Sequence, residues 1–121
     1  MDEPDIEFDE SEFDAFVESI EALHRSDVMM LDPNKVRDMR TAYGLLHKCF
    51  ALGDGVKVVC KQSNVAQDVG YISLEGASVG ITASAEFSKI AALASNTEVY
   101  PLANNKVRLT FGFNQLMVPL P

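Results

Sequence analysis

The chain has 121 residues, a formal net charge of −8 and 47% hydrophobic residues. This length suits one domain that buries a core without metal or disulfide help, and no apolar run approaches the roughly 20 residues of a membrane-spanning helix. Eight acidic residues and no basic one lie within the first 14 positions, and the other ten acids are matched by ten bases. This distribution argues against nucleic acid as a partner, because nucleic-acid binders carry a basic surplus.

Residues 1–10 are predicted to form a flexible acidic arm, because like charges along the arm repel one another. Residues 11–121 then form a single domain. Ser11 can cap a first helix that runs from about 11 to 25, with acids in its first turn. The apolar stripe of this helix consists of Phe13, Phe16, Val17, Ile20 and Leu23.

A second helix is predicted from about 33 to 51. Asp32 supplies the cap, and Pro33 takes the first helical position, where its missing N–H costs nothing. Its apolar stripe, at steps of three and four, consists of Val36, Met39, Tyr43, Leu46 and Phe50. The first helix is acidic and the second mainly basic, so we expect an antiparallel helical hairpin. The connection over 26–31 is too apolar for an exposed loop and is expected to pack.

From residue 56 the apolar period changes to two, which is typical of strands. The predicted strands cover about 56–61, 69–74, 77–82, 97–102 and 107–113, with a third helix around Phe87 to Ala94. Asn104 and Asn105 suit a hairpin turn, and Pro101 places its strand at a sheet edge. The predicted fold class is α+β in the order α-α-β-β-β-α-β-β, with a roughly five-stranded antiparallel sheet, two layers and the helices on one face.

Residues capable of chemistry are few and dispersed. His24 and His47 fall near opposite ends of the predicted hairpin, roughly 20 Å apart, so they cannot share a metal within one chain. Cys49 and Cys60 form no C-x-x-C motif and are expected to be free thiols in the cytoplasm, because no secretory leader pattern opens the chain. Gly53-Asp54-Gly55 follows a helix, which is the wrong context for a phosphate loop. We therefore expect no cofactor and no metal.

Two main hypotheses for function follow. The first, which the lack of a catalytic motif favours, is a small cytoplasmic non-catalytic module for protein–protein binding or assembly. The second is a small enzyme or ligand-binding domain with a pocket between helices and sheet, using His24, His47, Asp27 or Tyr71. In a third and weaker hypothesis the acidic arm imitates phosphate and occupies a basic site on a nucleic-acid-binding protein.

Self-association as a dimer is also predicted. Apolar residues remain at the two irregular ends of the domain after the helix stripes and one sheet face have filled the core. Exposed apolar patches on small proteins usually mark an interface, and a symmetric dimer is the commonest cover for one. The candidate interface residues are Met29, Met30, Leu31, Leu116, Met117, Val118 and Leu120.

Overall fold

The computed structural model describes residues 11–23, 29–50, 57–63 and 68–120. The helices are α1 (Ser11–Leu23), α2 (Pro33–Phe50) and α3 (Ala85–Leu93). The strands are β1 (Met29–Leu31), β2 (Lys57–Gln62), β3 (Gly70–Ser78), β4 (Asn96–Pro101), β5 (Lys106–Phe113) and β6 (Met117–Pro119). Two 3-10 turns, η1 (Val79–Ala83) and η2 (Ala103–Asn105), complete the order. The predicted α+β class is confirmed.

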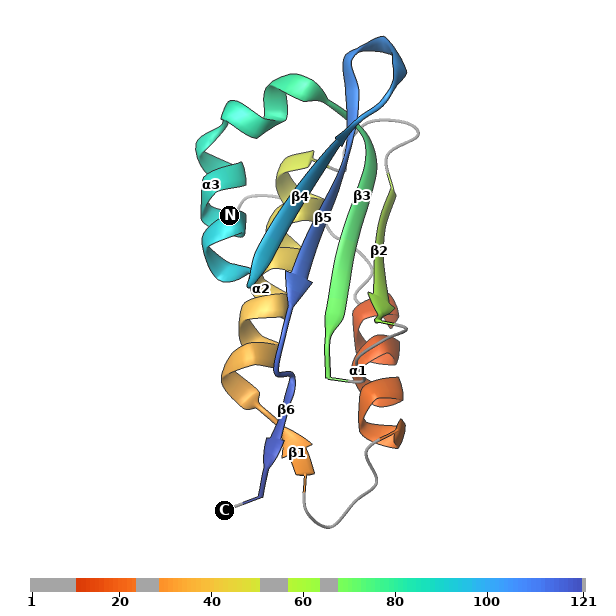
Figure 1. Ribbon diagram of the computed structural model, residues 1–121, viewed down its shortest axis with the longest axis vertical. Helices are drawn as coiled ribbons and strands as arrows, with labels where there is room; N and C mark the ends of the chain where they lie inside the picture. The colour runs from red at the N-terminus through yellow and green to blue at the C-terminus, as the bar shows by residue number, and fades with distance from the viewer. Residues whose placement is uncertain (1–10, 24–28, 51–56, 64–67, 121) are drawn as a thin grey trace, which may run out of the picture.

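One antiparallel sheet of four strands, in the order β2-β3-β5-β4, forms the body of the molecule. The three helices lie on one side of this sheet, and α1 and α2 run in opposite directions (Figure 1). Within the described ranges, no helix lies on the opposite face of the sheet. The predicted two-layer arrangement and the antiparallel helical pair are therefore present.

The core lies between the helices and the inner face of the sheet. The predicted stripes of α1 and α2 supply much of it, since Phe13, Ile20, Met39 and Leu46 are all fully buried. On the sheet side the buried residues alternate along β3 and β5, and they are Ile72, Leu74, Val107, Leu109, Phe111 and Phe113. Burial of these apolar side chains is the main stabilising contribution, at roughly 1.5–3 kcal/mol for each large one.

The start of α2 follows the predicted capping chemistry. The Asp32 carboxylate accepts a hydrogen bond from the Asn34 N–H at 3.0 Å, and the Asp32 carbonyl accepts one from the Val36 N–H at 3.0 Å. The expected charge match between the helices is also seen, because Arg40 on α2 forms an ion pair with Asp14 on α1 at 3.2 Å. Both side chains are about half exposed, at 45% and 54%, so this pair contributes at most about 1 kcal/mol.

The separate strand predicted over 77–82 does not exist. The second and third predicted strands form one strand, β3, whose register with β5 shifts between Glu75 and Ala77. Gly76 has φ 99°, a value that glycine adopts without a steric penalty, so the chain makes a bulge between the two segments predicted as separate strands. The chain then enters η1, where Val79 is 47% exposed. The main sheet consequently has four strands and not five.

The apolar segment after β5 folds back onto its own chain. β6 pairs with β1, so that Met117 lies opposite Leu31, in a two-stranded ribbon separate from the main sheet. The Leu116 N–H donates to the Asp68 carbonyl at 2.9 Å, and the Leu116 carbonyl accepts from the Asp32 N–H at 2.8 Å. The expected packing of the connection before α2 is thus confirmed for residues 29–31. No helix in the described ranges has the length and apolar character needed to cross a membrane.

Candidate functional site

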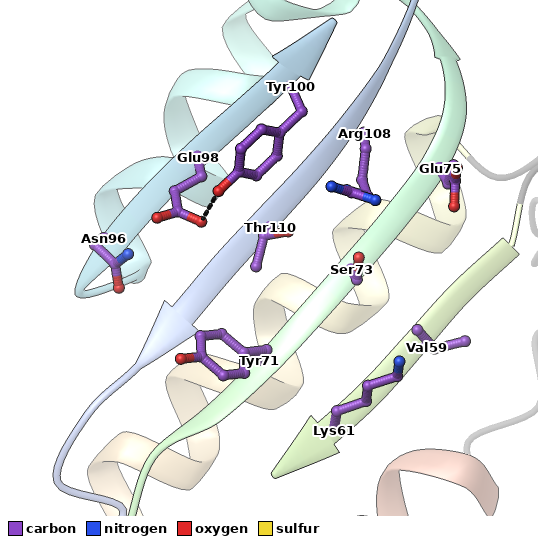
Figure 2. Close-up of a pocket in the computed structure, with 10 residues that line it drawn as sticks. All are labelled: Val59, Lys61, Tyr71, Ser73, Glu75, Asn96, Glu98, Tyr100, Arg108 and Thr110. Carbon is purple, nitrogen blue, oxygen red and sulfur yellow. Dashed lines mark hydrogen bonds between the residues drawn. The ribbon is translucent and has the colours of Figure 1, made fainter. Parts of the chain in front are cut away.

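The face of the main sheet that no described helix covers is hollowed. Side chains alternate between the two faces of a strand, so the neighbours of the buried core residues point to this side. They surround a hollow of about 550 Å³ (Figure 2). We call this surface the open face; its residues are Val59, Lys61, Tyr71, Ser73, Glu75, Asn96, Glu98, Tyr100, Arg108 and Thr110.

The open face is polar, aromatic and balanced in charge, with Lys61 and Arg108 against Glu75 and Glu98. The Tyr100 hydroxyl donates a hydrogen bond to Glu98 Oε1 at 2.9 Å, and this bond raises the pKa of Tyr100. The Arg108 guanidinium lies 4.9 Å from the centroid of the Tyr100 ring, within the range of a cation–π contact. Glu98, Tyr100 and Arg108 therefore form one linked group (Figure 2).

One edge of the sheet, β4, is also open. The Leu102 N–H donates to the Lys106 carbonyl at 2.8 Å, so the backbone groups of Leu102 point toward the strand segment that holds Lys106. In an antiparallel pair, residues whose N–H and C=O groups point toward the partner strand alternate with residues whose groups point away from it. Thr97 and Val99 fall at the outward positions, so their N–H and C=O groups point away from β5. No strand of the described chain lies on that side of β4. Pro101, which has no N–H, takes the next outward position, as the sequence predicted for an edge strand.

The opposite edge, β2, is protected. The Cys60 N–H points outward and donates to Glu12 Oε2 at 3.1 Å, and α1 lies alongside this strand (Figure 1). On β4, by contrast, Val99 and Tyr100 are 42% and 41% exposed. Unprotected edge strands invite pairing with another chain, and proteins usually cover or charge them. The two edges of this sheet thus differ, and the open one adjoins the open face.

Of the residues named for a pocket between helices and sheet, the two that the structure describes, His47 and Tyr71, are not brought together. Tyr71 lies on the open face, whereas His47 lies in α2 on the helix side, with its ring centroid 4.6 Å from that of Tyr43. Burial lowers the pKa of His47, and the Glu12 charge opposes this shift. His24 and Asp27 lie outside the described residues. The hollow is therefore on the face of the sheet opposite to the one expected.

The Cys60 thiol shows no sign of activation. Burial, reinforced by the Glu12 charge, raises the pKa of Cys60 to about 12, so this thiol is protonated at neutral pH. Cys49 belongs to α2, and Gly53-Asp54-Gly55 lies outside the described residues. Within the ranges that the structure describes, no three His, Cys, Asp or Glu residues are placed to hold a metal ion.

The candidate interface residues divide into three groups. Leu116 and Met117 are buried in the chain's own core, at 1% and 4% exposure. Leu120 is exposed. The half-buried members are Met29, Met30, Leu31 and Val118. An interface at the β1–β6 ribbon would therefore use the last two groups.

Sequence reasoning did not identify the open face as a site. Its residues are the polar partners in the alternating strand patterns, which by themselves indicate only exposure to water. Knowing that they converge requires the strand order and register, which bring Ser73 between Val59 and Thr110. Comparison of the chain with protein families, with curated proteins and with solved structures found no match.

Proposed function

We propose that this protein is a non-catalytic module for protein binding or assembly, and that it binds its partner along the open face and β4. The observation that carries the proposal is that one edge of the main sheet is covered by another part of the described chain and the other edge is not. Glu12 covers the β2 edge, whereas β4 presents the outward groups of Thr97 and Val99 beside an aromatic, charge-balanced surface. An extended segment that adds to such an edge gains main-chain hydrogen bonds, and the neighbouring side chains select its sequence.

A photo-crosslinking experiment in the source cell tests this proposal. A photoreactive phenylalanine analogue replaces Tyr100, which is 41% exposed in β4, or Val79, which is 47% exposed in η1. We expect discrete protein adducts from position 100 and none of the same mass from position 79. The adducts should be lost in Val99→Pro, which removes one outward N–H and which an edge position tolerates, as Pro101 shows. Equal labelling at both positions contradicts the proposal.

Self-association and a cytoplasmic location belong to the same proposal. The half-buried and exposed apolar side chains of the β1–β6 ribbon support a dimer at that end, with Leu120 as its most exposed apolar member. Cys60, a free thiol, suits a reducing compartment. Sedimentation at micromolar concentration should show a dimer that Leu120→Asp dissociates. A monomer in the unmodified protein would rule out this part of the proposal.

Ligand binding is a second candidate function, and the hollow on the open face favours it. Its volume of about 550 Å³ lies within the range of small-molecule sites, and Tyr71 and Tyr100 offer two rings against which a polar, flat ligand can stack. Native mass spectrometry of protein purified from its source would then show a bound small molecule. That mass should be absent from Tyr71→Ala, and its absence from the unmodified protein would favour the protein-binding proposal.

A further inference from the structure

A second hollow lies on the helix side of the molecule, where β1 leads into α2. It has a volume of about 390 Å³ and is lined by Leu31, Pro33, Val36, Arg37 and Arg40. The first three side chains make its wall apolar, and the two arginines add positive charge. We call this feature the α2 hollow. Another apolar side chain is the most favourable occupant of an apolar wall, because both surfaces then lose contact with water.

The exposed apolar side chains of the described residues are the available candidates for this contact. The large ones are Val79, Val99, Tyr100 and Leu120. Val79 belongs to η1, and Val99 and Tyr100 belong to β4, whereas Leu120 directly follows β6. β6 pairs with β1, and Leu31 of β1 also lines the α2 hollow. Of the four side chains, Leu120 is therefore the one that lies at the same end of the molecule as the hollow (Figure 1).

Leu120 does not reach the α2 hollow of its own chain. Met117 lies opposite Leu31, and Leu120 lies three residues further along the chain, or about 10 Å at roughly 3.3 Å per residue. The chain that enters α2 continues the other way, because the Asp32 N–H donates to the Leu116 carbonyl at 2.8 Å. Along the ribbon, Leu120 and α2 therefore lie on opposite sides of the pair formed by Leu31 and Met117 (Figure 1).

A second copy of the chain can bring the two surfaces together. From their position at one end and their separation within one chain, we infer that two copies associate across a two-fold axis at their β1–β6 ribbons, and that Leu120 of each copy enters the α2 hollow of the other. A two-fold interface needs a surface that carries both members of each contact, and this end of the molecule does so. The inference rests on the self-association proposed above and names the contact that produces it.

The side chains around the contact are compatible with it. Arg37 is exposed, so its aliphatic stem can cover an inserted leucine while its guanidinium stays in water. The charge of Arg40 is offset by Asp14, at 3.2 Å. Met30 and Val118 lie opposite each other in the ribbon and are half-buried. Contact between two ribbons therefore covers more apolar surface than Leu120 alone.

Two matched substitutions test the location of the contact. Val36→Trp fills the α2 hollow with a side chain of the same molecule, and Val79→Trp makes the same change at a 47% exposed position in η1. In sedimentation, the first should raise the dissociation constant of the dimer about tenfold or more, because it excludes a leucine side chain, and the second should leave it unchanged. Since Val36 is half-buried, thermal melting checks that its variant folds, and Arg37→Trp at an exposed position gives the same test if it does not.

A mixing experiment tests whether the leucine and the hollow come from different copies. Leu120→Asp keeps the hollow and lacks the leucine, whereas Val36→Trp keeps the leucine and lacks the hollow. A dimer of either variant alone has lost both contacts, but a mixed dimer retains one. The equimolar mixture should therefore form dimers with a dissociation constant about tenfold or more below that of either variant.

The outcomes separate this inference from the proposal on which it rests. A dimer of the unmodified protein that Val36→Trp and Val79→Trp weaken equally overturns the inference and leaves self-association in place. A mixture that associates no more tightly than its two components has the same meaning. An unmodified protein that is monomeric at micromolar concentration overturns both.

Discussion

The Glu12 carboxylate of α1 accepts a hydrogen bond from the backbone N–H of Cys60 in β2, with 3.1 Å between oxygen and nitrogen. This one contact satisfies an outward-pointing donor and places a charge beside the strand, two of the ways in which proteins prevent edge pairing. It also affects the chemistry of its neighbours, because the same carboxylate raises the pKa of Cys60 and opposes the lowered pKa of His47.

Cys60 should react slowly with thiol reagents. Its pKa of about 12, against an ordinary value of 9.0, lowers the thiolate fraction at pH 8 about a thousandfold. The rate measured with a disulfide reagent should be lower by about that factor than for a small thiol, and should rise tenfold per pH unit through pH 10. Peptide mass analysis separates Cys60 from Cys49. Glu12→Gln, which removes the charge, should increase the rate at Cys60, and an unchanged rate would contradict the electrostatic contribution.

Acidification should destabilise the fold through His47. Its pKa is lowered in the folded state, chiefly by burial, so the unfolded chain binds a proton more readily. The stability due to this group is complete above pH 6.5 and is lost as the pH falls from 6.5 toward the lower, folded pKa. The drop in melting temperature between pH about 7.5 and about 5 should be smaller in His47→Gln. Equal drops in both proteins would contradict this role.

Leu116 and Leu120 offer a comparison of two leucines in one segment. Leu116→Ala removes a buried side chain and should lower the free energy of unfolding by about 2–5 kcal/mol. Leu120→Ala alters a side chain that is 42% exposed and should change it by no more than about 0.5 kcal/mol. Denaturant titration of both variants measures the difference. Similar values for both would mean that the segment does not close the core of its own chain.

Gly70 and Gly112 provide a second matched pair. A Cβ at Gly70 would collide with the buried Phe16 ring, so Gly70→Ala should cost about 1–3 kcal/mol. A Cβ at Gly112 would meet the side-chain amide of Asn96, which is exposed and can rotate away, so Gly112→Ala should cost less than about 1 kcal/mol.

Phe16→Leu should relieve part of the loss in free energy of unfolding that Gly70→Ala causes. A double-mutant cycle of the two substitutions should therefore show a coupling energy, with the double variant more stable than the sum of the single effects predicts. The same cycle with Gly112→Ala serves as its control and should be additive, because Asn96 and not Phe16 faces that position. Additivity at Gly70 would contradict the close packing of the ring against the strand.

Local signals in the sequence were sufficient for much of the fold. The Asp32-Pro33 pair marks the start of α2, and the alternation of Val107, Leu109 and Phe111 matches their burial in β5. Asn104 and Asn105 have φ of 63° and 60°, as the predicted turn requires. These features depend on neighbours in the chain, and sequence periodicity reports on such neighbours directly.

Features that depend on distant segments could not be predicted. Gly76 suits a turn as well as a bulge. It lies in a bulge because β3 pairs with β5 on both sides of it, and this pairing cannot be read from the sequence. The β1–β6 ribbon has strands of three residues, too short for a period to be read. The open face could not be predicted for a related reason. Polar residues that alternate with core residues along a strand give the same sequence pattern whether or not they converge in space.

The β1–β6 ribbon also affects when the protein can complete its fold during synthesis. Its first strand precedes α2, and its second follows every strand of the main sheet. During translation, therefore, Phe16 and Met39 leave the ribosome long before Leu116, which packs in the same region around Gly70. Contacts between segments so far apart in sequence slow folding and leave apolar surface exposed meanwhile. The apolar surface around Gly70 should consequently stay incompletely buried until the final strand has emerged.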